Sequence, residues 1–350
     1  KIFPSSLVAG CTRFVESLCV CITLLPSLFT SLFHLVSNLL ARTAFAVSHD
    51  ALLQSHTEDE DHKVNASLIS ALNHLIRNAN TEQSTFVIRR IRLDLHRFAI
   101  SISPSHPCLN ITPMNSSVLI LSRILTYSRS RHTYWSHLPL LLTDLCNVSS
   151  VLALHHRTIC PKHLSAFYFT LRSISLFLSH KGLVLQPVHI SAALSSLLPP
   201  LVPADSADTK IIDESYRILD ACIRHRIGLS FKCIPSILAT LRNLLSTLEH
   251  LNEHDQSLYA PKVGRLYELL AQEHRYVRKY CPYVLADYVS AAANDQQPWA
   301  TYVLPGIYAI IDACTDDELQ HTYALLDPAR RLVFSTLHTN YTRTHKYTGR

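Results

Sequence analysis

Side chains that can bind a metal ion occur close together at two places in the sequence. His250 and His254 flank Glu253, and their spacing of four residues would put two imidazole ligands on one face of a helix. The polar end of a helix explains these residues better. His155, His156 and Cys160 form a second cluster, which is an equally weak pattern for a metal site. No metal or other cofactor is expected from either place.

The motifs that build nucleotide-binding and hydrolytic sites are missing from the sequence. No GxxxxGK[ST], GxGxxG, GxSxG or HExxH pattern occurs. The 350 residues include only 6 dispersed glycines, too few for the tight loops that such motifs need. The sequence therefore predicts a protein that is not an enzyme.

Basic side chains that could bind nucleic acid gather in the first half of the chain. Residues 95–204 contain eight Lys or Arg residues but a single acidic residue, Asp144. The candidates for RNA contact are Arg89, Arg90, Arg92, Arg97, Arg123, Arg129 and Arg131. Contact between such a basic band and phosphate releases counterions and favours binding. A solvated helix face has the same composition, so both interpretations stay open.

Aromatic residues accompany part of this basic band. Tyr134 and Trp135 follow Arg129 and Arg131, and such rings can stack on the bases of a single strand. Aromatic residues beside a helix start belong more often to the core. The sequence favours this second interpretation.

These side chains must be positioned by helices, because alternating strand patterns are nearly absent. The predicted helices are 6–24, 27–47, 63–79, 84–101, 116–128, 134–147, 161–180, 187–198, 208–227, 233–251, 255–272, 275–292, 299–313, 316–326 and 328–346. Helices of this length with short connections fit an all-α stack of antiparallel pairs. We therefore predict an irregular α-solenoid like those of HEAT and armadillo proteins, without a clean repeat period.

Proline-rich and polar breaks divide the predicted helices into groups. The breaks lie at 49–62, 103–113 and 199–208, and the last contains three prolines. We place the domain boundary there. Residues 1–203 form a helical-repeat region with the basic band, and residues 204–350 form a C-terminal helical domain.

Composition indicates where such a protein works. The 10 cysteines include no CxxC pair, which favours reduced, mostly buried thiols and a cytosolic or nuclear protein. The apolar stretch 18–46 carries leucines at helical spacing, among them Leu32 and Leu35, with polar residues between them. This pattern predicts amphipathic helices and no membrane anchor. A first residue other than Met predicts a piece of a longer protein.

The segment 304–331 is the best specified part of the chain. Pro305 and Gly306 are expected to break a helix there. Thr315 and Glu318 have the spacing of a capping box, and Asp327 followed by proline is a second start signal.

The apolar residues around these signals have helical spacing. We expect Ile307, Ile311, Val333, Phe334, Leu337 and Tyr341 to face inward. We expect Arg330, Arg343, His345 and Lys346 to be exposed, and they are the candidates for partner contact. The buried positions have two open interpretations, because they either dock a partner or cover the last repeat of a solenoid.

This C-terminal region resembles a known family of nucleolar proteins. The resemblance rests on Leu304, Pro305, Gly306, Ile307, Tyr308, Asp312, Cys314, Glu318, Leu319, Gln320, Leu326, Pro328, Arg331, Phe334, Leu337, Tyr341, His345 and Lys346. The stretches GRLY at 264–267 and RYVRKYCPY at 275–283 also match. The region is similar to the end of the family called unhealthy ribosome biogenesis protein two, or nucleolar pre-ribosomal-associated protein two. The chain departs from the family at His338, where an aromatic residue is commoner.

The resemblance implies a non-catalytic scaffold in early assembly of the large ribosomal subunit. It implies action in the nucleolus on precursor ribosomal RNA, together with other pre-60S factors, among them a large paralogous partner and a DEAD-box helicase. The alternative from the residues alone is a cytoplasmic HEAT-like adaptor that binds other proteins.

Overall fold

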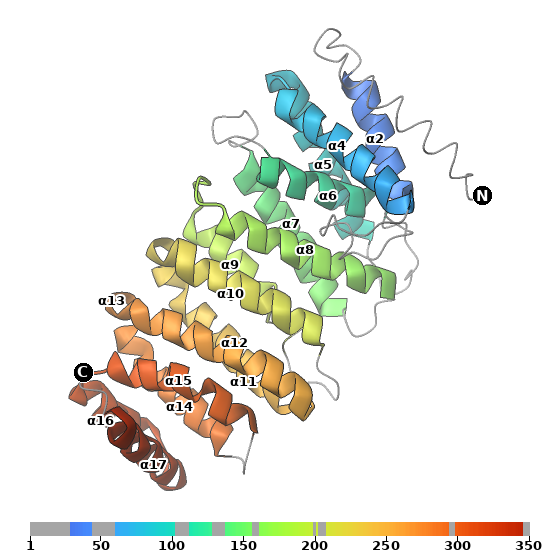
Figure 1. Ribbon diagram of the computed structural model, residues 1–350. Coiled ribbons are helices and arrows are strands. Elements are labelled where there is room, and N and C mark those ends of the chain that lie inside the picture. Colours follow the sequence, from blue (N-terminus) through green and yellow to red (C-terminus); the bar gives the residue numbers. More distant parts are fainter. Residues whose placement is uncertain are drawn as a thin grey trace. The chain divides into compact units, whose positions relative to one another are not determined.

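The computed structural model describes residues 29–43, 60–101, 112–127, 137–155, 161–198, 201, 208–293 and 298–345 (Figure 1). Every regular element in these ranges is helical, so the all-α prediction is confirmed. The chain divides into two compact units, Lys1–Leu185 (unit 1) and Gln186–Arg350 (unit 2). The predicted boundary between residues 203 and 204 lies outside the described residues.

Unit 1 is built from helices that contact both their neighbours in the chain and the helices beyond. They are α2 (Phe29–Thr43), α4 (Glu60–Asn78), α5 (Thr81–Ser101), α6 (Thr112–Tyr127), α7 (Leu138–His155) and α8 (Pro161–Ser179). Helix α5 packs against α6 and α7, whereas α6 and α7 both pack against α8. These alternating contacts place the helices in two rows, and each helix buries the side that faces the others.

The amphipathic pattern of α2 is confirmed, but one of its predicted inward residues is wrong. Phe29, Leu32, Phe33 and Val36 are buried, whereas Leu35 is exposed. The stripe that packs against α4 and α6 is made by the phenylalanines, because their spacing with Leu32 and Val36 follows the helical period more closely. None of the helices within the described ranges is long and apolar enough to cross a membrane.

Unit 2 contains the C-terminal helices. Its elements are α9 (Pro187–Ser195), α10 (Thr209–Ser230), η3 (Phe231–Cys233), α11 (Ile234–Glu249), α12 (Glu253–Gln272), α13 (His274–Val277), η4 (Arg278–Tyr280), α14 (Cys281–Ala292), α15 (Pro298–Asp312), α16 (Asp316–Leu325) and α17 (Pro328–His345). Helices α10, α12 and α15 lie side by side, and α14 contacts α11, α15, α16 and α17 (Figure 1). Trp299, Tyr267 and Phe334 are among its largest fully buried side chains.

Two local expectations for unit 2 are wrong. The predicted helix 275–292 is divided by the 3-10 turn η4, and Pro282 then stands in the first turn of α14, where its missing N–H has no partner to lose. His250 and His254 do not share a helix face, because His250 caps the end of α11 and His254 lies in the first turn of α12. No group of three or more metal-ligating side chains was found within the part of the chain that the structure describes.

The closest approach in unit 2 is the crossing of α12 and α15 at two glycines. A Cβ atom added to Gly306 would lie 2.1 Å from the carbonyl oxygen of Gly264, and one added to Gly264 would lie 3.0 Å from the carbonyl oxygen of Tyr302. Only glycine permits two helix backbones to approach this closely. The predicted break at Pro305 and Gly306 is therefore wrong: α15 runs through both residues, and its packing against α12 offsets the cost of the internal proline.

Candidate interaction surfaces

Helix α5 gathers four of the seven arginines predicted to contact RNA. Its buried stripe includes Val87, Ile91, Leu95 and Phe98, which fixes the rotation of the helix against α6 and α7. The opposite face exposes Arg89, Arg92, Leu93, His96, Arg97 and Ile100. The structure therefore places three of the candidate arginines on one exposed face, with Arg90 half-buried at its edge.

Two of these arginines are bound to carboxylates of unit 1. The Nε atom of Arg90 lies 2.9 Å from a carboxylate oxygen of Asp94, which also accepts a hydrogen bond from Ser117 at 3.0 Å. The Nε atom of Arg92 donates to Asp144 on α7 at 2.7 Å. Asp144, the single acidic residue of the basic band, is thus paired with Arg92. Within the described ranges, Arg89 and Arg97 take part in no ion pair.

The remaining candidates of the basic band are not gathered onto this face. Arg123 lies on α6, which packs against α5, and its side chain is half-buried. Arg129, Arg131 and the neighbouring aromatic pair lie outside the described residues. Among the arginines predicted to contact RNA, the three that lie on an exposed face of the described residues are therefore Arg89, Arg92 and Arg97 of α5.

The capping box that begins α16 is confirmed and has an additional partner. The Glu318 carboxylate accepts hydrogen bonds from the backbone N–H and the hydroxyl group of Thr315, both at 2.6 Å. Arg278 of η4 donates to the same carboxylate at 2.9 Å. Burial alone would raise the pKa of Glu318, but the hydrogen bonds from Thr315 and Arg278 together lower the pKa below its ordinary value.

The start of α17 is confirmed as well, and Arg331 joins the two last helices. The Asp327 carboxylate accepts from the backbone N–H of Arg330 at 2.9 Å. The Nε atom of Arg331 donates to the carbonyl oxygens of Tyr323 and Leu326, both at 2.8 Å. Carbonyl groups at a helix end have no partner within the helix, so Arg331 stabilises the end of α16.

Most of the predicted inward residues are buried. Ile307, Ile311, Phe334 and Leu337 belong to the core, as predicted. Val333 was expected to face inward, but 36 % of its surface is exposed. The buried positions of α17 are Phe334 and Leu337, and Val333 lies one residue before the start of that stripe.

Aromatic rings continue this stripe along α17. The Phe334 ring centroid lies 4.7 Å from that of Tyr323, and the His338 ring lies between those of Phe334 and Tyr341, at 6.4 and 6.0 Å. His338 therefore takes part in this row of rings. The Tyr341 hydroxyl donates to Asp312 of α15. Burial, and secondly this hydrogen bond, raises the pKa of Tyr341 to about 12.

Two of the four candidates for partner contact, Arg330 and Arg343, are exposed on α17. Arg330 is exposed and pairs with Asp327 at 3.2 Å, and Arg343 is exposed. His345 is the last residue of α17, and Lys346 lies outside the described residues. An ion pair as exposed as that of Arg330 contributes little to stability, so both arginines are available to a partner.

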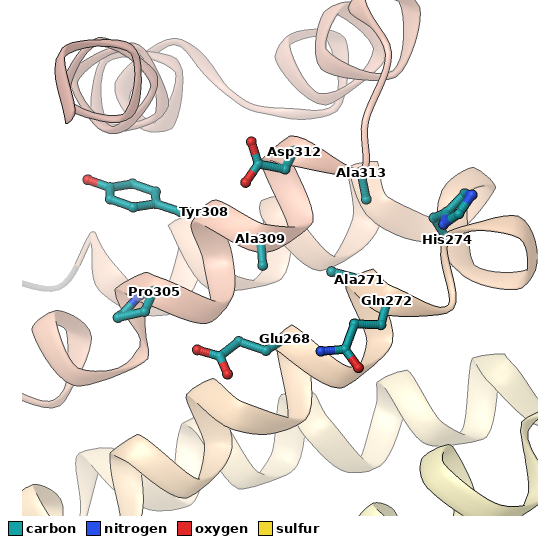
Figure 2. A pocket seen from close by; sticks show the side chains of 9 residues that line it. All are labelled: Glu268, Ala271, Gln272, His274, Pro305, Tyr308, Ala309, Asp312 and Ala313. Atoms are coloured by element: carbon teal, nitrogen blue, oxygen red, sulfur yellow. The ribbon is translucent and has the colours of Figure 1, made fainter. Parts of the chain in front are cut away.

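A pocket of about 730 Å³ lies between α12, α13 and α15 (Figure 2). Its lining combines Glu268, Asp312, Tyr308 and His274 with small side chains, among them Ala271 and Ala309. In Figure 2 these two alanines point into the space between the helices. The carboxylates of Glu268 and Asp312 come from two different helices, and Asp312 also accepts a hydrogen bond from Tyr341. Sequence analysis missed this pocket, since its walls come from helices that only tertiary packing brings together.

Four of the five cysteines in the described ranges are buried and Cys314 is partly buried, which agrees with the expectation of mostly buried thiols. Cys146 and Cys222 are buried free cysteines, and burial raises the pKa of Cys146 to about 12. Cys314 follows the end of α15 and interacts with the Cys281 thiol at the start of α14. This interaction, followed by burial, raises the pKa of Cys314, whereas the same interaction lowers the pKa of Cys281. A thiol with a raised pKa stays protonated and is a poor nucleophile.

The comparisons with known proteins agree with the resemblance of the C-terminal region. The model of the Urb2/Npa2 family matches residues 168–350, which is more than half of the chain and includes the helix caps and the glycine crossing. No solved structure matches the chain. The family is not known as catalytic. The chain therefore belongs to the Urb2/Npa2 family, which is involved in nuclear ribosome biogenesis.

Proposed function

We propose that this chain is a non-catalytic scaffold in the early nucleolar assembly of the large ribosomal subunit. It binds other pre-60S factors, among them a large paralogous partner and a DEAD-box helicase, and it contacts precursor ribosomal RNA. The family match over residues 168–350 carries this proposal. The buried thiols support it, because they suit a reducing compartment such as the nucleus.

The packing pattern supports an irregular α-solenoid as the architecture of this scaffold. Within unit 1, helix α5 contacts α7 and α6 contacts α8; within unit 2, α10 contacts α12 and α12 contacts α15. Helices that contact the next but one helix of the chain form rows, as the paired helices of a solenoid do. Such stacks expose long surfaces on which several partners bind at once.

The exposed face of α5 supports the RNA contact. Arg89 and Arg97 lie two helical turns apart on this face, so they can meet successive phosphates of one strand. Asp94 and Asp144 are occupied by Arg90 and Arg92, so neither carboxylate competes for Arg89 and Arg97, which form no ion pair among the described residues.

A protein partner is the second candidate for the same face. Leu93 and Ile100 lie among the arginines, and 43 % and 71 % of their surfaces are exposed. Apolar side chains next to arginine are typical of the centre of a protein interface. RNA contact predicts that the arginines matter most, whereas a protein partner predicts that Leu93 and Ile100 do.

The scaffold proposal is tested by the particles with which the protein travels. Tagged full-length protein is purified and sedimented through a gradient, and RNA is crosslinked to the recovered fractions. Sedimentation with precursor large subunits is the expected result. Free migration without RNA would contradict the proposal and favour the HEAT-like adaptor.

The RNA contact is tested by substitution of Arg89 and Arg97 of α5. Arg89→Ala with Arg97→Ala removes two cations and leaves both ion pairs intact, so the fold is kept. We expect weaker RNA binding and a salt dependence whose slope falls by about 1.4, since each lost contact with a single strand removes about 0.7. Arg242→Ala with Arg265→Ala removes the same charge from exposed positions of unit 2 and is the control. Equal slopes in both variants would show that α5 does not touch RNA.

A further inference from the structure

Exposed aromatic rings and cations alternate at one end of unit 2. The segment 274–283, with the sequence HRYVRKYCPY, contains three Arg or Lys residues and no Asp or Glu. It forms α13, η4 and the start of α14, and η3 lies against it through a ring contact. We define the aromatic–basic face as Phe231, Lys232, Arg275, Tyr276, Lys279, Tyr280 and Tyr283.

The backbone of this segment is anchored by small buried side chains. Val277 and Cys281 are fully buried, and the Cys281 thiol donates to the carbonyl oxygen of Val277 at 3.7 Å. Around these anchors Arg275 and Lys279 are exposed and Tyr276 and Tyr280 are half-buried, because the short helices turn through one full circle in three to four residues. The fold thus exposes the cations and leaves part of each ring accessible.

Two rings of this face are exposed, and one pair of its rings lies close together. The ring centroids of Phe231 and Tyr276 lie 6.1 Å apart at an interplanar angle of 30°. Phe231 exposes 43 % of its surface and Tyr283 exposes 47 %. Exposed aromatic rings of this size are unfavourable in water unless they have a partner.

Each of the cations lies over or beside a ring. The Nζ atom of Lys232 is 5.8 Å from the Phe231 centroid, the Cζ atom of Arg275 is 4.9 Å from that of Tyr276, and the Nζ atom of Lys279 is 4.9 Å from that of Tyr280. Within the described ranges these three cations form no ion pair, whereas Arg278 is bound to Glu318. Glu273, which directly precedes the segment, is half-buried.

We propose that the aromatic–basic face binds single-stranded RNA. Rings that expose their faces can stack on unpaired bases, and cations beside the rings reach the phosphates of the same strand. The bases of a duplex are already stacked and hidden, so a duplex would leave the rings unused. An acidic protein segment would use the cations alone. This surface is separate from the face of α5, so it adds a second RNA contact to the proposed scaffold.

The test uses the full chain and a fluorescein-labelled oligouridylate of about 15 nucleotides, a length that spans such sites. Binding is measured by fluorescence anisotropy between about 50 and about 200 mM salt. The charge variant is Lys232→Ala with Arg275→Ala and Lys279→Ala, and the ring variant is Phe231→Ala with Tyr283→Ala. The control, Arg242→Ala with Arg265→Ala and Lys210→Ala, removes equal charge from exposed positions elsewhere in unit 2.

The two variants have different expected signatures. The charge variant should lower the slope of the salt dependence by about 2, at about 0.7 for each lost cation. The ring variant should keep the slope and weaken binding about fivefold or more for each lost stack. Unchanged unfolding midpoints show that both variants fold, and ultraviolet crosslinks of the unaltered chain should map to 231–232 and 275–283.

Several results would overturn the inference. One is equal binding by the charge variant and the control, and another is crosslinks that avoid the face. Polyglutamate serves as a second probe, which represents an acidic protein segment. If the ring variant binds RNA fully while the charge variant loses binding to both RNA and polyglutamate, the face is a site for acidic protein segments. The α5 variant is measured in parallel. Loss of RNA in that variant alone would refute this inference and leave the proposed function standing.

Discussion

At the scale of single residues, polar side chains near the C-terminus end or join helices. Glu318 accepts from Thr315 and Arg278, and Arg331 donates to two carbonyl oxygens at the end of α16. Asp312 accepts from the Tyr341 hydroxyl and so links α15 to α17. The polar residues of the segment 304–331 thus fix where the last three helices stop, start and meet.

Glu318 should contribute a stability that depends on pH. Its pKa is lowered in the folded protein, so stabilisation is full above the ordinary pKa of a glutamate and is lost as pH falls through the lowered value. We expect Glu318→Ala to lower the free energy of unfolding by about 1 to 2 kcal/mol at neutral pH. Glu318→Gln keeps a capping oxygen, so it should cost less.

Fluorescence of a single tryptophan measures this effect. The chain has 2 tryptophans, and Trp135→Phe leaves the buried Trp299 as a reporter of unit 2. In this background the unaltered carboxylate should give an unfolding midpoint that declines in acid, and Glu318→Gln should flatten the decline. An equal decline in both proteins would assign the acid sensitivity to other groups.

At the scale of helices, unit 2 depends on one close crossing and on exposed faces around it. Gly264 and Gly306 let the backbones of α12 and α15 touch, and this contact positions the pocket walls beside it. The internal prolines of α12 and α15 are both exposed, so neither ring enters the crossing. Proline is tolerated here because packing stabilises these helices more than their own hydrogen bonds do.

Gly306→Ala should destabilise unit 2, and Gly228→Ala is its matched control. The added methyl group at Gly306 would meet backbone atoms at 2.1 and 2.9 Å, and backbone cannot move aside cheaply, so we expect a loss of about 1 to 3 kcal/mol. Nothing lies within 4 Å of a Cβ at Gly228, so alanine there should stabilise α10 by about 0.5 to 1 kcal/mol. Urea unfolding followed by Trp299 fluorescence gives both values. A neutral Gly306→Ala would mean that the crossing can open without cost.

At the scale of the whole molecule, the proposed interaction surfaces are divided between the two units. The arginines of α5 belong to unit 1, whereas the aromatic–basic face and the exposed Arg330 and Arg343 of α17 belong to unit 2. The family match includes the whole of unit 2 and the larger part of α8, the last helix of unit 1. A scaffold that holds RNA and proteins together requires such a division of its surface.

Arg330 and Arg343 should matter for assembly and not for folding. We expect Arg330→Ala with Arg343→Ala to leave the unfolding midpoint of unit 2 unchanged, because both side chains are exposed. Recovery of protein partners with the tagged full-length protein should fall about fivefold, as expected when an arginine anchor of an interface is removed. Quantitative mass spectrometry of the purified particles measures this. Equal recovery of protein partners by this variant and by Arg242→Ala with Arg265→Ala would exclude Arg330 and Arg343 as docking residues.

The sequence by itself determined the helical class, the buried stripes and the starts of α16 and α17. These features depend on residues three or four positions apart, such as Thr315 with Glu318, so local spacing predicts them. Local spacing also misled, since Pro305 and Gly306 look like a helix break and Val333 looks like an inward residue.

Only the tertiary structure decided which distant residues meet. Gly264 reaches Gly306, Arg92 reaches Asp144, and Phe231 reaches Tyr276 because helices stack and bring their faces together. Likewise, the fold assigns His250 and His254 to different helices. The physical reason is that periodicity specifies which side of a helix is buried, whereas the partner of that side depends on how all the helices of a unit fill a common core.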